Sequence, residues 1–169
     1  MLKKKLLAGA LSFLLILPMN GCVSRVILSA LVATLGSATS SLANLEGNPT
    51  LAAQIKTDTT AAVSAIDNWQ SGTPAQDVIE ALGIVIDDLN LIPGTGPFAP
   101  LIDLALATVQ SILEIVTNNS PAPVTAHRAK VPHRTVSYTG KVPKNSGDFK
   151  KKWNSIVMAN PQLAPAAIK

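Results

Sequence analysis

Apolar side chains recur at helical spacing between residues 74 and 92 of this chain. Successive apolar positions there are four, three, four and three residues apart: Val78, Leu82, Val85, Leu89 and Ile92. This spacing puts them on one stripe of a helix that packs along its length against another helix. Thr73 and Gln76 stand where a capping box would begin that helix. The pattern therefore predicts a buried amphipathic helix over residues 74–91.

The acidic side chains of the same segment fall largely on the opposite side of the predicted helix. They are Asp77, Glu80, Asp87 and Asp88. We expect these carboxylates to lie on a solvated face. Because adjacent residues on a helix point in different directions, Asp87 and Asp88 are not expected to converge on one atom as a catalytic acid pair.

Two neighbouring segments also predict helices. Residues 49–70 begin with Pro49 at the first helical position, and the preceding residue, Asn48, is a good N-cap residue. The apolar side of that segment consists of Leu51, Ile55, Ala62, Ile66 and Trp69. Residues 98–117 are apolar almost all round, which predicts a helix at the centre of a bundle or under a partner. Asp103 and Glu114 argue against a membrane span there, because carboxylates inside a bilayer are costly.

A fourth helix is expected over residues 26–45, but Gly36-Ser37 and Ser40-Ser41 are weak helix formers. We therefore expect this helix to be frayed or broken. The short loops between the predicted helices favour antiparallel neighbours. The fold class that follows is all-α, a small up-down helical bundle of three to four helices with a proline-rich basic C-terminal tail.

Composition and charge sharpen this description. Aromatic residues make up only 4% of the chain, which favours packed helices over sheets. Residues 26–119 contain one lysine and nine acidic residues, whereas residues 120–169 contain nine basic residues and one acid. This asymmetry indicates that the tail either folds onto the acidic body or meets an anionic partner, and both contacts would be sensitive to salt.

The tail divides into two parts. Residues 119–148 contain Pro121, Pro123, Pro132 and Pro143 among polar and basic residues, which is typical of an extended linker. Within it, residues 135–139 could form one short strand if another strand offered an edge. Residues 149–169 begin with a short basic amphipathic helix.

Five residues of that helix are candidates for the contact made by the tail: Phe149, Lys150, Lys151, Lys152 and Trp153. Two interpretations remain open. In the first, Phe149 and Trp153 enter the headgroup region of a membrane while the lysines meet anionic lipid. In the second, Trp153 packs on the bundle and the lysines meet its acidic residues.

The first 22 residues have the three parts of an export signal. Lys3, Lys4 and Lys5 are followed by an apolar run and then by Asn20-Gly21-Cys22, which contains the only cysteine of the chain. No disulfide can therefore stabilise the fold. The body that follows is long enough to bury one hydrophobic core.

Gly21 and Cys22 make this leader resemble those of bacterial lipoproteins. In that class a lipobox precedes a cysteine that is acylated and becomes the mature N-terminus; here it corresponds to Met19, Asn20, Gly21 and Cys22. The resemblance implies a signal peptide over residues 1–21 and a lipid anchor on Cys22. It also implies an exported protein, at the outer membrane facing the periplasm if the cell has two membranes. Met19 and Asn20 depart from the usual lipobox, so cleavage after Ala43 and an uncleaved anchor helix remain alternatives.

Residues for catalysis or metal binding are scarce. The chain contains no HExxH or GxSxG motif, and it has no cysteine beyond Cys22. His127 and His133 are six residues apart without nearby acids, which is no recognised metal spacing. The glycine-rich loop over 92–100 contains three prolines, which predicts a rigid turn and not a phosphate cradle. We expect no enzyme activity, no cofactor, no metal and no nucleic-acid partner.

Three functional interpretations follow. The leading one is a non-enzymatic, membrane-anchored lipoprotein in which helices 74–91 and 98–117 and the basic tail hold a protein partner, as a structural or adaptor subunit. The second is an envelope-binding module whose domain 22–118 spaces a tail that binds anionic lipid or cell-wall polymer. The third is a small membrane-active or self-assembling protein with an uncleaved leader.

Overall fold

The computed structural model describes residues 24–70, 72–121 and 135–169, and every regular element in those ranges is helical. Five α-helices and two 3₁₀ helices follow one another along the chain. They are α1 (Arg25–Leu45), α2 (Pro49–Asn68), α3 (Gln76–Leu91), η1 (Gly96–Phe98), α4 (Ala99–Asn118), α5 (Ser146–Met158) and η2 (Pro161–Ala166). Residues 135–139 have no regular structure, so the single strand considered for them does not form.

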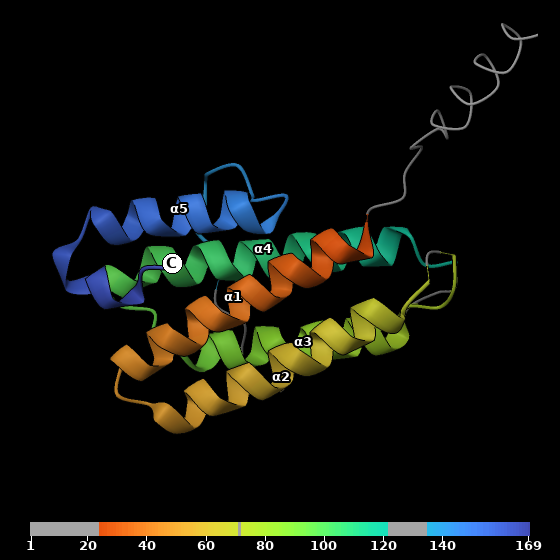
Figure 1. The fold of residues 1–169 in the computed structure, drawn as a ribbon, viewed down its shortest axis with the longest axis horizontal. Coiled ribbons are helices and arrows are strands. Elements are labelled where there is room, and N and C mark those ends of the chain that lie inside the picture. The colour runs from red at the N-terminus through yellow and green to blue at the C-terminus, as the bar shows by residue number, and fades with distance from the viewer. Residues whose placement is uncertain (1–23, 71, 122–134) are drawn as a thin grey trace, which may run out of the picture.

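Helices α1 to α4 run up and down, and each packs on the helix that follows it in the chain (Figure 1). This arrangement confirms the all-helical up-down class. The stripe predicted on α3 is confirmed, because all five of its apolar residues are buried. Helix α4 also lies in the core of the bundle, so the chain itself buries most of the apolar surface of this helix.

The C-terminal region is part of the bundle and not a tail beside it. Helix α5 packs against α1 and α4, and η2 packs against α1 and α5 (Figure 1). Three residues of α5 and two of η2 are buried in the same core: Phe149, Trp153, Val157, Leu163 and Ala166. The short helix predicted from residue 149 is therefore a fifth helix of the bundle, and it begins at Ser146, inside the stretch interpreted as linker.

The turn between α1 and α2 shows why these two helices are antiparallel neighbours. Gly47 has a φ angle of 77°, a left-handed conformation that ends α1. The N–H of Asn48 then donates to the Ala43 carbonyl at 2.9 Å. The Asn48 side chain in turn accepts from the Leu51 N–H and caps α2, as the Asn48-Pro49 pair predicted.

Helix α1 is continuous through Gly36-Ser37 and Ser40-Ser41, so the expectation of a frayed or broken helix was wrong. Tertiary packing overrides the weak local propensity here, because Gly36 is buried where α1 crosses closest to Thr59 of α2. A residue without a side chain is what allows this close approach.

Two further expectations about α3 were wrong. The capping box does not form, since Ala75 is the N-cap residue and the Thr73 hydroxyl donates to the Gln70 carbonyl instead. Asp87 and Asp88 are not solvated, because both are buried among the helices. Asp77 and Glu80 are exposed as predicted.

Two helical stretches, Arg25–Leu45 and Gly96–Asn118, are long and apolar enough to cross a membrane by composition alone. In the 18-residue apolar window of each stretch, 56% and 50% of the residues respectively are buried inside the bundle. The core helices of a globular bundle have this same hydropathy and burial. These stretches are therefore accounted for by the fold.

Candidate functional site

The two aromatic residues of α5 lie inside the protein. Phe149 and Trp153 are fully buried, and their ring centroids are 5.5 Å apart. The Trp153 indole N–H donates to the Ala166 carbonyl of η2 at 2.8 Å. Both aromatic side chains are thus committed to the docking of α5, and in this conformation neither is exposed to a lipid surface.

The last residues of the chain are held to α5 by polar contacts. The Asn154 side-chain amide donates to the Ile168 carbonyl and accepts from the Ile168 N–H, each at 2.8 Å. The Lys150 ammonium donates to the backbone carbonyl of Lys169. Lys150 therefore has a structural contact, which separates it from the lysines that point outward.

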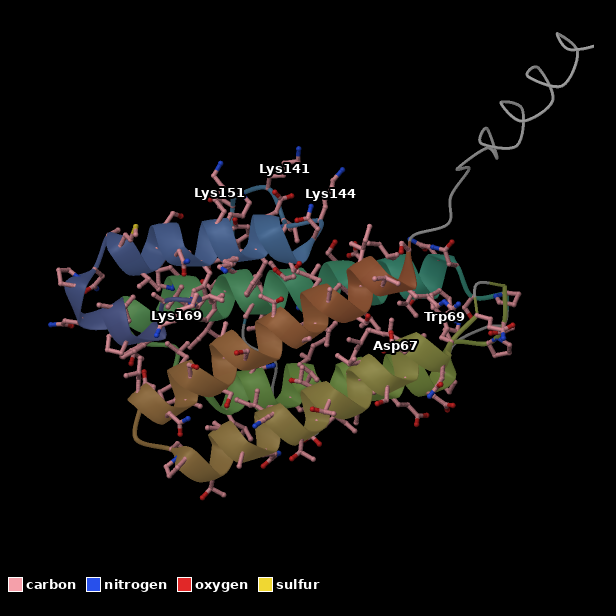
Figure 2. All side chains as sticks on the ribbon, viewed as in Figure 1. Asp67, Trp69, Lys141, Lys144, Lys151 and Lys169 are labelled. Atoms are coloured by element: carbon pink, nitrogen blue, oxygen red, sulfur yellow. The ribbon has the colours of Figure 1, made fainter. Side chains whose placement is uncertain are left out.

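Lys141, Lys144 and Lys151 form what we call the basic surface. All three side chains are exposed and project away from the bundle on the outer side of α5 (Figure 2). Lys152, which is half-buried, lies next to Lys151 in the same helix. Across the described ranges, residues 135–169 carry six lysines and only Asp148 as an acid.

Apolar packing and hydrogen bonds to the backbone dock the C-terminal region. No ion pair joins any lysine to a carboxylate within the part of the chain that the structure describes, although residues 24–121 carry nine acids. The second interpretation of the tail combined packing of Trp153 on the bundle with lysine–acid contacts. The packing occurs, but no such ion pair forms among the described residues. The positive charge of the basic surface is consequently not neutralised by these acids.

A second polar feature lies between α2 and α3. The Asp88 side chain is only 2% exposed, and its Oδ1 accepts a hydrogen bond of 2.5 Å from the Gln54 side-chain amide. Its other oxygen is buried and accepts no hydrogen bond from a polar N–H or hydroxyl group of the described residues. The carboxyl group of Asp58, one turn after Gln54 on α2, is the second group that contacts the Asp88 carboxyl.

Burial is the largest cause that raises the pKa of Asp88, to about 7. The hydrogen bond with Asp58 and the negative charges of Asp58 and Asp87 raise the pKa of Asp88 further, whereas the Gln54 hydrogen bond lowers it. Two carboxyl groups in contact cannot both ionise cheaply, which favours the protonated form of Asp88.

A third feature is a groove of about 380 Å³ between α1 and α2. Small and hydroxyl-bearing residues line it, and Lys56 contributes the one charged side chain. Thr59 lines this groove, and its buried hydroxyl makes no hydrogen bond to the described residues. By contrast, six other helical threonines donate to the carbonyl four residues earlier: Thr34, Thr39, Thr57, Thr60, Thr108 and Thr117.

Several predicted site residues fall outside the described ranges. Cys22, His127 and His133 are among them, so the lipidation site and the histidines are not placed. Over the described ranges, no group of three or more histidine, cysteine or acidic side chains could hold a metal ion. The loop over 92–100 is a turn that leads through η1 into α4, with Gly96 at a φ angle of 59°.

Sequence reasoning missed the Asp58–Asp88 contact. One signal was present, because Asp88 follows Val85 by three residues and so flanks the buried stripe instead of opposing it. The Gln54–Asp58 spacing of four residues likewise puts both polar groups on one flank of α2. Only the packing angle of α2 and α3 brings these two flanks together.

No protein-family model, curated protein or solved structure matches this chain.

Proposed function

We propose that this chain is a non-enzymatic, lipid-anchored envelope protein whose basic surface binds an anionic envelope partner. The shared chemistry of that partner is a dense array of negative groups, supplied by anionic lipid headgroups or by an acidic cell-wall polymer. Of the functions predicted from the sequence, this is the envelope-binding module, with one change. The binding energy comes from lysine charge alone, because the aromatic residues of α5 are used in the core.

One observation carries this proposal: Lys141, Lys144 and Lys151 project together from one side and pair with no carboxylate of the described residues. A lysine near an anionic membrane surface contributes about 1 kcal/mol to binding. Three such lysines would supply roughly 100-fold in affinity at moderate salt, since 1.4 kcal/mol is tenfold. Such a charge-driven contact weakens as salt screens it.

A lipid anchor on Cys22 would also place the chain at a membrane. Helix α1 begins at Arg25, directly after the leader and its Cys22. Acylation of Cys22 would thus tether the bundle close to the membrane, with little spacer. Stable anchoring by acyl chains is commonly assisted by basic residues, which is the role proposed for the basic surface if its partner is lipid.

The experiment compares two variants with equal changes in net charge. K141Q/K144Q/K151Q removes three positive charges from the basic surface, whereas T57E/S64E/Q70E adds three negative charges at exposed positions on α2 and just after it. Unacylated protein is tested on vesicles with and without phosphatidylglycerol and on isolated cell wall. We expect only the lysine variant to lose binding and salt dependence. Equal losses in both variants would mean that net charge, and not the basic surface, decides binding.

The same assay separates the two sources of negative charge. Retention by phosphatidylglycerol vesicles identifies lipid, whereas retention by cell wall alone identifies the polymer. No retention on either, at low salt, would refute the proposal.

An adaptor function is the second candidate, and the groove between α1 and α2 favours it. The apolar faces of α3 and α4 that were expected to hold a partner are covered by the chain itself. The groove instead offers small side chains and the exposed side chain of Lys56. Ser37 and Ser41 are exposed on its α1 side, so S37W or S41W should abolish partner crosslinking in cells without unfolding the bundle.

A further inference from the structure

The acid pair between α2 and α3 has no role in binding to an envelope, yet it sits where two core helices meet. Asp88 lies on α3 at the edge of the buried stripe, one turn after Val85. Its partners, Gln54 and Asp58, lie one turn apart on α2. Buried polar atoms at this place are expected to have partners, because an unpaired buried charge is costly.

The charge around the pair is negative within the described residues. From α2 the neighbouring groups are the Asp58 carboxyl and the neutral Gln54 amide, and from α3 the Asp87 carboxyl adds to the field. Lys56, the one lysine of α2, lines the groove toward α1 instead. The Gln54 amide donates to Asp88 Oδ1, and the Asp58 carboxyl is the second group that contacts the Asp88 carboxyl.

We propose that one proton shared between Asp58 and Asp88 fastens α2 to α3, and that loss of this proton as the pH rises through neutrality loosens this helix pair. The protonated carboxyl donates its O–H to the other, ionised carboxylate. Deprotonation replaces that hydrogen bond with two like charges in a buried contact. The bundle is therefore a proton-dependent structure.

The direction of the pH dependence follows from linkage. Burial and the Asp58 contact raise the pKa of Asp88 to about 7 in the folded chain, far above the ordinary range of an aspartate in an unfolded chain. Between about pH 4 and pH 7 the folded chain thus holds a proton that the unfolded chain has released. Stability is greatest at the acidic end of this window, falls as the pH rises, and becomes level above the folded pKa.

The test measures chemical denaturation of the full chain between pH 5 and pH 8. We expect the unfolding equilibrium constant of the wild-type protein to rise with pH, by at most about tenfold per unit because one proton is involved. D88N retains the shape of Asp88 and can donate to Asp58, but it cannot ionise. This variant should lose most of the pH dependence and be more stable than wild type at pH 8.

D67N provides the matched control, since Asp67 is an exposed aspartate of α2 outside the pair. It should keep the wild-type pH profile. The two histidines also titrate in this range, so the difference between D88N and wild type is the quantity that isolates the pair. An equal pH slope in D88N and wild type would overturn the proposal.

A direct measurement does not depend on the stability of the variants. Carbon NMR of the aspartate carboxyl groups should show one carboxyl of the pair titrating near neutrality in wild type, and that titration should vanish in D58N and in D88N. Titration of every aspartate near pH 4 would overturn the proposal. Stabilisation of wild type by Mg²⁺ or Ca²⁺ at pH 8, absent from D88N, would also overturn it, because the pair would then be a cation site.

Discussion

The side chain of Thr59 occupies the space that a Cβ atom on Gly36 would need. A Cβ built on Gly36 would lie 2.2 Å from Thr59 Cγ2 and 2.6 Å from Thr59 Cβ, far inside van der Waals contact. The absence of a side chain at Gly36 therefore lets α1 and α2 approach closely. It also explains why a glycine is retained at the middle of a long helix, where it costs about 1 kcal/mol relative to alanine.

G36A is expected to destabilise the bundle by up to about 2 kcal/mol. The gain in helix propensity is about 1 kcal/mol, but overpacking of a tight contact costs about 1–3 kcal/mol, and here the Thr59 Cβ, fixed to its backbone, is one of the clashing atoms. Urea denaturation measures the effect. S37A, an exposed substitution at the next position, should be neutral or slightly stabilising. Stabilisation by G36A would mean that the helices are farther apart than described.

Trp153 is expected to be the residue on which docking of α5 depends most. W153A should cost about 3–5 kcal/mol, as is typical when a buried tryptophan is truncated, and should increase hydrogen exchange throughout α5 and η2. W153F should cost about 1–3 kcal/mol, because it leaves the buried Ala166 carbonyl without its donor. K151A, an exposed change on the same helix, serves as the control.

Salt is expected to have little effect on the docking of α5. The contact is made by buried apolar residues, and no lysine of the described residues pairs with a carboxylate. Hydrogen exchange in α5 should therefore be similar in low and high NaCl. A marked increase in exchange at high salt would show that attraction between the acidic body and the lysines holds this helix in place.

The stripe of α3 is expected to tolerate no charge. L82D and V85D should each unfold the bundle, since each would bury an unpaired carboxylate. E80Q, on the exposed side of the same helix, should change stability by less than about 0.5 kcal/mol. Circular dichroism at 222 nm is a sufficient measurement. Asp87 is unsuitable as an exposed control, because its side chain is buried.

C22S is expected to block acylation and to release or mislocalise the protein. Acyl chains would supply most of the membrane affinity of a lipoprotein, so the variant should accumulate as a precursor. Mass spectrometry of the N-terminus and cell fractionation provide the readouts. An unchanged mass and distribution would exclude the lipid anchor and leave later cleavage or an uncleaved leader as the explanation.

Sequence alone was sufficient for the helices that pack by a local pattern. The 4-3-4-3 spacing on α3 and the Asn48 cap of α2 depend on residues close together in the chain, so both could be predicted from local rules. The expectation that α1 would be frayed or broken was wrong because it also used only local rules. Helix propensity is local, whereas the Thr59 side chain that makes a glycine favourable there comes from another helix.

Tertiary structure alone decided what the charged residues do. From the sequence, Asp87 and Asp88 were assigned to a solvated face and the lysines of 149–169 were expected to reach a membrane or the acidic residues of the bundle. In the fold, Asp88 is buried against Asp58, and Lys151 points to solvent while Trp153 fills the core. Periodicity determines which residues share a helix face. Which face meets water depends on the other helices that surround it. In this chain α5 also packs on the bundle, and its periodicity alone could not predict that contact.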